Sequence, residues 1–307
     1  MKSFKIKEEA KAPLYILALT LLLTLSGVVR IARPDTLTEA FIAAIFLEVL
    51  VFALPTFFFL KYVDRTYVSV IKTKIRIRNL PLVISLLFTA TFGFLLLNSL
   101  SYVLGIASAD FTSSASFIFS GISTKTNVLY VLFAFGILPA VIEEFAFRGI
   151  IYRAYLKYGS FTAVIMSALA FAICNFSIAS FGAYFFMGIV LAFSVRMTGN
   201  IWSAVFIRFF ANVLSVYFLP ALWNVIVQPM GILFALFIIV AIFFIFFIIS
   251  LYLSEKYFAR LSVTIPEKNM PSGEKYKTAK RLATLVIHPV FAAAVVLSLI
   301  VALILGA

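Results

Sequence analysis

Long uninterrupted apolar runs are the feature of this sequence that most constrains its fold. A helix needs about 20 mostly apolar residues to cross a bilayer. Because lipid offers the backbone no hydrogen-bond partner, such runs form helices, and they are too long for the strands of a transmembrane barrel, which span about ten residues. The sequence therefore predicts an all-α, polytopic transmembrane helix bundle of about nine spans, at residues 13–32, 38–60, 80–107, 127–148, 160–178, 182–197, 201–220, 229–254 and 284–306.

The composition supports the same class of protein. Of the 307 residues, 64% are hydrophobic and 12% are charged, whereas soluble domains are about 45–50% apolar and about 25% charged. These values exclude a soluble globular protein and a disordered chain. The single cysteine, Cys174, allows no internal disulfide, and the single histidine, His288, excludes a zinc site that needs two histidines of this chain. We assign no cofactor and no metal site from the sequence, although whether a metal enters stays open.

Positive charge is distributed unevenly between alternate loops. The net charge is +13, and 20 of the 25 Lys and Arg residues lie at the N-terminus, in the loops 61–79 and 255–283, or near residues 153–157 and 196. Loops rich in Lys and Arg stay in the cytoplasm. We therefore predict a multi-pass protein of the cell membrane with a cytoplasmic N-terminus and an external loop at 108–126. The basic excess favours contact with anionic membrane lipids, and it requires no nucleic-acid partner.

The chain divides into three predicted blocks. Residues 1–126 form N-terminal support helices, and their first apolar run is interpreted as a retained anchor because it is longer than the apolar region of a signal peptide. Residues 127–220 form a compact core that contains most of the ionisable groups inside apolar segments. Residues 221–307 form C-terminal helices joined by a basic cytoplasmic linker at 255–283, which contains Pro, Gly and mixed charges.

Charged residues inside the apolar segments are the strongest functional signal, because each costs several kcal/mol in hydrocarbon. On a helix Arg148 lies one turn after Glu144 and can pair with it. Glu143 is then turned about 100° away, which leaves it available as a base facing a cavity. The alternative interpretation is a surface ion pair at a helix end. Glu48, alone in the second segment, is expected to have a structural role.

Other polar residues are predicted at the same depth. Glu143 and Asn175 each lie 16 residues from Gly159, which places both about 24 Å along antiparallel helices. Arg208 and Asn212 are one turn apart in the segment that follows. The sequence therefore predicts one site built from three helices, with the candidate residues Glu143, Glu144, Arg148, Asn175, Arg208 and Asn212.

These motifs resemble the CAAX-protease and bacteriocin-processing family (CPBP, also called Abi), which includes type II CAAX prenyl endopeptidases and lysostaphin-resistance-like proteins. The resemblance covers roughly residues 127–220. It implies a glutamate-type intramembrane endopeptidase, a hydrolase in which Glu143 activates water with help from a second-motif histidine. The third motif, His-x-x-x-Asn or Asp, would line the opposite wall and help to stabilise the oxyanion. The residues that carry the resemblance are Glu143-Glu144-x-x-x-Arg148, Phe171-x-x-x-Asn175 and Arg208-x-x-x-Asn212.

The chain departs from this family pattern at both histidines, which are replaced by Asn175 and Arg208. Asparagine cannot accept or deliver a proton at neutral pH, and a cation beside Glu143 makes its carboxylate a weaker base. Arg208 can in principle stabilise an oxyanion, so activity stays open, but the sequence favours a catalytically degenerate protein. One alternative is a pseudoprotease that binds a transmembrane or lipidated protein partner. Another, from a different class, is a transporter or channel.

The only histidine, His288, precedes Pro289 near the start of the last segment. Seven residues of helix beyond Arg281 place it about 10 Å below the cytoplasmic boundary. One hypothesis is that it serves as a relocated catalytic base. The favoured interpretation is that His288 caps the beginning of the last helix, where Pro289 leaves backbone groups free.

Overall fold

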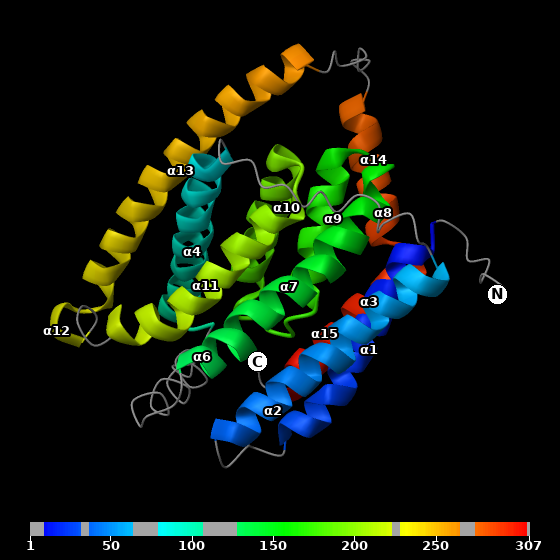
Figure 1. The fold of residues 1–307 in the computed structure, drawn as a ribbon, viewed down its shortest axis with the longest axis horizontal. Helices are drawn as coiled ribbons and strands as arrows, with labels where there is room; N and C mark the ends of the chain where they lie inside the picture. Colours follow the sequence, from blue (N-terminus) through cyan, green and yellow to red (C-terminus); the bar gives the residue numbers. More distant parts are fainter. Residues whose placement is uncertain are drawn as a thin grey trace.

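The computed structural model describes residues 9–31, 37–63, 79–106, 128–222, 228–264 and 274–305. Within these ranges the chain forms helices and turns and no strand, which confirms the all-α prediction. Its helices pack into one bundle (Figure 1). The first part comprises α1 (Lys11–Ile31), α2 (Leu37–Glu48), the π-helix η1 (Val49–Ala53), α3 (Leu54–Phe58), the π-helix η2 (Phe59–Val63) and α4 (Leu80–Val103).

The remaining helices follow after residue 127. The central part comprises α6 (Val128–Val131), the π-helix η6 (Leu132–Ile137), α7 (Leu138–Glu144), the π-helix η7 (Phe145–Ile151), α8 (Tyr152–Leu156), α9 (Ser160–Ile173), α10 (Phe181–Thr198) and α11 (Ile201–Leu222). The last part comprises α12 (Gln228–Met230), α13 (Ile232–Thr264), α14 (Glu274–Val286) and α15 (Pro289–Leu305).

In the described part of the chain, five helices are long and apolar enough to cross a membrane. The bent pair α14–α15 adds a sixth if it is one span, and three shorter apolar helices occupy the other predicted segments: Lys11–Ser26, Ser160–Ile173 and Ile201–Leu214. The chain is thus a multi-pass membrane protein. The count of nine spans and the location in the cell membrane stay predictions.

Prolines inside two of the spans coincide with local widening of the helix. Pro139 lies at the start of α7, directly after η6, and Pro55 lies at the start of α3, directly after η1. A proline inside a helix removes a backbone donor and clashes with the preceding turn, and a π-helical turn is one of the distortions that accommodate this. The third widened segment, η7, begins directly after Glu144.

The central helices lie between two flanking groups (Figure 1). α4 packs on α10 and α11 and carries α13 on its other side, whereas α15 packs on both α1 and α9. One hydrophobic core runs through these groups, from Ile16 of α1 and Leu86 of α4 to Phe291 of α15. The division into blocks 1–126, 127–220 and 221–307 stays a prediction, and the core is shared by helices of all three.

Three predicted boundaries differ from the structure. The segment predicted at 127–148 belongs to a helical run that continues to Leu156. The region 255–283, predicted as a linker, begins and ends in helix, because α13 continues to Thr264 and α14 begins at Glu274; residues 265–273 lie outside the described residues. The segment predicted at 284–306 is bent by 60° between α14 and α15.

The bend has a local cause in the sequence. Pro289 is the first residue of α15, and a proline disfavours helical geometry in the residue before it, which is His288. The loop predicted outside, 108–126, and most of the loop predicted inside, 61–79, lie outside the described residues. The predicted orientation is therefore still a prediction.

Candidate functional site

A fully buried ion pair joins Glu144 to Arg148. The Nη1 atom of Arg148 lies 2.9 Å from Oε1 of Glu144, and both side chains are 0% exposed. Arg148 also donates from Nη2 to the backbone carbonyl of Gly188, at 3.1 Å. The predicted pairing is confirmed, and the alternative of a surface ion pair is wrong, because neither side chain reaches the surface. The ion pair and the added hydrogen bond compensate for burying the two charges.

A second ion pair joins Glu143 to Arg208, 65 residues further along the chain. The Nη2 atom of Arg208 donates to Oε2 of Glu143 at 2.9 Å, and the two side chains are only 11% and 12% exposed. This contact ties the end of α7 to α11. The carboxylate of Glu143 is thus paired with a guanidinium, and its role as a base stays a prediction. The prediction that Arg208 faces Glu143 is confirmed.

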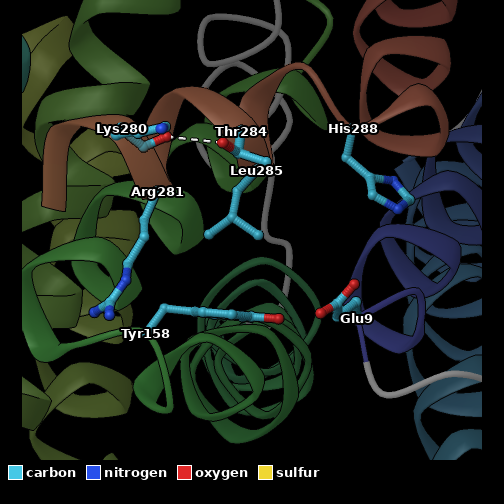
Figure 2. A pocket seen from close by; sticks show the side chains of 7 residues that line it. All are labelled: Glu9, Tyr158, Lys280, Arg281, Thr284, Leu285 and His288. Carbon is cyan, nitrogen blue, oxygen red and sulfur yellow. Dashed lines mark hydrogen bonds between the residues drawn. The ribbon is translucent and has the colours of Figure 1, made fainter. Parts of the chain in front are cut away.

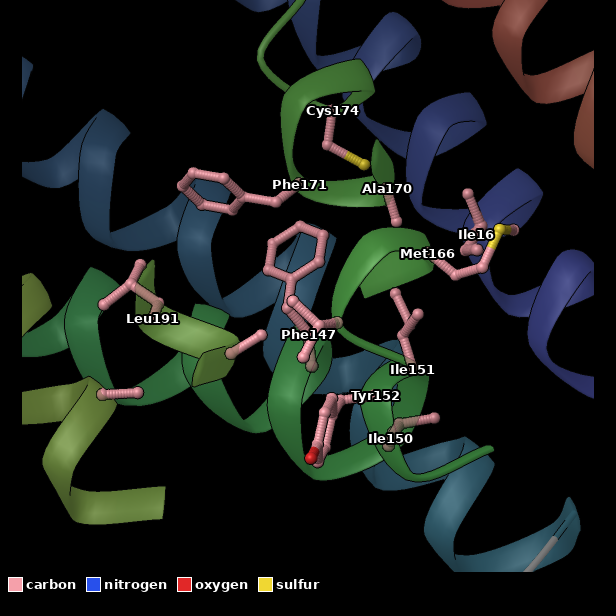
Figure 3. Packing of buried hydrophobic residues seen from close by; sticks show 14 of the residues in the cluster. Ile16, Phe147, Ile150, Ile151, Tyr152, Met166, Ala170, Phe171, Cys174 and Leu191 are labelled. Atoms are coloured by element: carbon pink, nitrogen blue, oxygen red, sulfur yellow. The ribbon is translucent and has the colours of Figure 1, made fainter. Parts of the chain in front are cut away.

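Phe171 of α9 connects the two ion pairs. The guanidinium carbons of Arg148 and Arg208 each lie 4.9 Å from the centre of its ring. Phe147 meets the same ring edge to face, with 5.2 Å between the centroids (Figure 3). Cation–π contacts of this kind stabilise desolvated arginines. Two cations and one aromatic ring therefore form a single cluster at the junction of η7, α9 and α11.

The cluster depends on a close crossing of α9 and α10. A Cβ atom added to Gly188 would lie 2.8 Å from Cα of Ala168, so only glycine fits at this crossing. Small residues let membrane helices approach closely. The close approach places the carbonyl of Gly188 within hydrogen-bond distance of Arg148. Sequence analysis missed this residue, although the small-x-x-x-small pattern Gly188-x-x-x-Ala192 is a signal that could have identified it.

The turn before α11 sets the position of Arg208. Gly199 adopts a left-handed backbone conformation (φ 66°) that ends α10, and glycine adopts it without a steric penalty. Asn200 then accepts a hydrogen bond from the backbone N–H of Trp202 through Oδ1, at 3.0 Å. This is a helix N-cap, so the motif Thr198-Gly199-Asn200 serves to begin α11 at a defined residue.

The two asparagines behave differently from the charged residues. Asn175 lies in the turn after α9, and its Nδ2 donates to the carbonyl of Phe171 at 2.7 Å. The prediction placed Asn175 on the helix; in the structure it closes the last turn of α9. Asn212 lies half-buried on α11, one turn after Arg208. Among the described residues no hydrogen bond joins either asparagine to Glu143.

His288 lies away from this cluster. It lines a pocket with Tyr158, which follows Glu143 by 15 residues along nearly continuous helix and so lies roughly 20 Å from it. The carbonyl of His288 accepts a hydrogen bond from the N–H of Ala292 in the first turn of α15. The structure therefore supports the interpretation of His288 as a helix cap and not as a relocated base. Within the described ranges, no group of three His, Cys, Asp or Glu residues could hold a metal ion.

These observations define a membrane-embedded helix bundle with a buried Glu-Glu-Arg-Arg cluster. Residues 125–214 match the family model described as type II CAAX prenyl endopeptidase Rce1-like. The match contains the whole cluster and confirms the resemblance over this segment, so this part of the membrane-embedded chain is similar to the type II CAAX prenyl endopeptidases. Comparisons with curated proteins and with solved structures returned no match.

Proposed function

We propose that this protein is a catalytically degenerate CAAX protease-like protein that binds a transmembrane or lipidated protein partner without cleaving it. The observation that carries the proposal is the ion pair between Arg208 and Glu143, with 2.9 Å between Nη2 and Oε2. The resemblance implies a histidine at the position of Arg208 and a water-activating role for Glu143. Arg208, which stays positively charged, therefore lies where the resemblance implies a histidine that can accept and donate a proton.

The chemistry of water activation explains why this substitution matters. A general base must accept a proton during the reaction, and protonation of Glu143 would break its charge-assisted hydrogen bond to Arg208. Asn175, at the position of the second-motif histidine, directs its amide to the carbonyl of Phe171. Neither residue can relay the proton, so the cluster lacks both partners of the implied base.

The remaining cluster suits binding better than ion transport. Glu144 and Arg148 are fully buried and paired, and Glu143 and Arg208 are paired in turn, so four formal charges cancel within one site. A transport path instead needs a charged group that changes partners.

The test of degeneracy compares membrane-protein fragments by mass spectrometry in cells that carry the wild type or Glu143→Ala. Glu255→Ala is the matched control, because Glu255 is an exposed glutamate near the end of α13. We expect identical fragments in all three strains. Fragments that disappear only with Glu143→Ala would overturn the proposal and identify an active protease.

The binding role needs a separate measurement. A photo-crosslinking residue placed at Asn212, one turn from Arg208, should capture a protein that carries a transmembrane segment or a lipid group. The same probe at Lys256, exposed near the end of α13, is the control position. Capture should be lost when Arg208→Ala and Glu143→Ala are combined. Equal capture from both positions, or capture that survives the double substitution, would contradict binding at the cluster.

A further inference from the structure

The junction of α14 and α15 contains a second candidate site, independent of the function proposed above. α15 is apolar throughout, whereas α14 carries four of the chain's Lys and Arg residues together with apolar positions at Leu282, Leu285 and Val286. The two helices meet at an angle of 60°. A basic amphipathic helix that turns away from an apolar span is typical of a segment that lies in the membrane interface.

A pocket of about 310 Å³ lies beneath this junction (Figure 2). Its walls come from α14, from the beginning of α15, from the turn after α8 and from the residues just before α1. This volume is at the lower end for small-molecule sites, which fits a polar headgroup better than a whole amphiphile. The lining residues are Glu9, Tyr158, Lys280, Arg281, Thr284, Leu285 and His288.

The charged groups around the pocket do not neutralise one another. Within the described residues, Glu9, Lys280, Arg281 and His288 form no ion pair with each other. Nδ1 of His288 is buried and has no hydrogen-bond partner there. In Figure 2 the imidazole of His288 points toward Glu9, while Arg281 extends to the opposite side of the Tyr158 ring. The pocket therefore presents two permanent cations and one carboxylate.

The beginning of α15 adds further positive potential. His288 is the residue before this 17-residue helix, and its carbonyl accepts the N–H of Ala292. Pro289 has no N–H, so the first turn offers only the N–H groups of Val290 and Phe291, which have no partner within the helix, and the helix dipole places partial positive charge at this end. An anion is favoured at such a position. The helix terminus and the two cations thus outweigh the single carboxylate of Glu9.

Exposed apolar surface adjoins the pocket and indicates where its ligand comes from. Ile287, at the bend, is 73% exposed, directly between the pocket residue His288 and the apolar end of α14. An acyl chain of a bilayer lipid would cover this side chain while the phosphate of the same lipid lies in the pocket.

We propose that this pocket binds the headgroup of an anionic phospholipid from the leaflet in which α14 lies. Arg281 and Lys280 bind the phosphate, and the first turn of α15 adds positive potential at the other end of the pocket. Glu9 accepts hydrogen bonds from the hydroxyl or ammonium groups of the headgroup. Ile287 contacts the acyl region. The site lies roughly 20 Å along the helix from the Glu143 cluster, by the position of Tyr158.

The test uses purified protein freed of lipid in a neutral detergent, titrated with phosphatidylglycerol or phosphatidylcholine and followed by native mass spectrometry. We expect phosphatidylglycerol to bind more tightly than phosphatidylcholine. Lys280→Ala with Arg281→Ala should weaken phosphatidylglycerol binding roughly thirty-fold, since each interfacial cation contributes about a five-fold effect. Arg196→Ala with Lys256→Ala is the matched control, because it removes two exposed cations elsewhere and should change little.

Two further measurements distinguish lipid binding in the pocket from binding of a free anion and from binding to a diffuse basic surface. Thr284→Phe keeps every charge but fills the pocket, and it should abolish the preference for phosphatidylglycerol. Inorganic phosphate at millimolar concentration should leave the lipid bound. Displacement by inorganic phosphate would overturn the lipid assignment in favour of a free anion. Equal loss in both double variants, or undiminished binding in Thr284→Phe, would overturn the pocket in favour of a diffuse basic surface.

Discussion

Arg208 holds the carboxylate of Glu143 across two helices that are distant in sequence, with 2.9 Å between Nη2 and Oε2. The contact lies at the edge of the buried cluster, where both side chains keep slight exposure. It also orders the ring of Phe171, because the guanidinium of Arg208 lies against it at 4.9 Å. One substitution at Arg208 thus changes the partner of Glu143 and the packing of α9 on α11.

Restoring the family pattern should test whether the remaining cluster is competent. Arg208→His together with Asn175→His returns titratable groups to both motif positions, which frees the carboxylate of Glu143 from its guanidinium and should supply a proton relay. We expect new membrane-protein fragments in cells that carry the double variant. They should vanish when Glu143→Ala is added. Fragments that persist in the triple variant would come from another protease and contradict the assignment of Glu143.

Arg148→Ala should destabilise the protein strongly. It leaves Glu144 buried at 0% exposure without its cation, and breaking a buried ion pair costs about 3–5 kcal/mol. Thermal unfolding of the purified protein in detergent measures the loss. Glu144→Gln combined with Arg148→Met removes both charges and should recover part of the stability. Equal unfolding temperatures for Arg148→Ala and the wild type would show that the pair is not needed for folding.

Gly188→Ala should weaken the crossing of α9 and α10. The added Cβ would lie 2.8 Å from Cα of Ala168, and because backbone cannot yield easily, we expect a cost of about 1–3 kcal/mol. Gly182→Ala on the same helix is the control, since its Cβ would meet nothing within 4 Å. Thermal unfolding in detergent again reports the difference. A loss of the same size in both variants would point to helix propensity instead of the crossing.

Ser298→Ala should loosen the last helix from the central bundle. The hydroxyl of Ser298 donates to the carbonyl of Ile173 at 2.7 Å in a buried position, and hydrogen bonds between membrane helices contribute about 0.6 kcal/mol on average. The small cost is best measured by hydrogen exchange at the end of α9. Val296→Ala, at an exposed site on α15, serves as the comparison. If exchange rises equally in both, the hydrogen bond is not what holds α15.

The orientation of the chain can be tested by labelling single cysteines from outside intact cells. The background is Cys174→Ala, which removes the only native cysteine. Cysteines in 61–79 and 255–283 should stay unlabelled until the membrane is opened, and a cysteine in 108–126 should react at once, because Lys and Arg concentrate in the first two regions. Labelling of 255–283 in intact cells would reverse the predicted topology.

Much of the architecture was predictable because it follows from local physics. Apolar runs of about 20 residues determine helices in lipid regardless of what surrounds them. The pair Glu144–Arg148 was predictable for the same reason, because residues four apart face each other on any helix. The helix cap at His288 follows from Pro289 in a similar way. Each of these inferences needs only the geometry of neighbouring residues.

Features that depend on the packing of distant segments could not be predicted from the sequence. The sequence pattern did not predict the π-helical segment η7 or the continuation of α13 to Thr264, within the region predicted as a linker. Asn175 was placed on a helix that in fact ends at Ile173. Ser298 of α15 donates a hydrogen bond to α9, and no sequence pattern predicted this contact.

The sequence by itself determined that this is a multi-pass helical membrane protein, and that Glu143, Glu144, Arg148 and Arg208 are charges in apolar surroundings that must find partners. Only the tertiary structure decided which partners these are. These contacts depend on how α7, α9, α10 and α11 are rotated against one another. They are the ion pair of Arg208 with Glu143, the hydrogen bond from Arg148 to the carbonyl of Gly188, and the stacking of both arginines on Phe171. That rotation is set by side-chain packing between helices far apart in the chain, which no spacing along a single helix encodes.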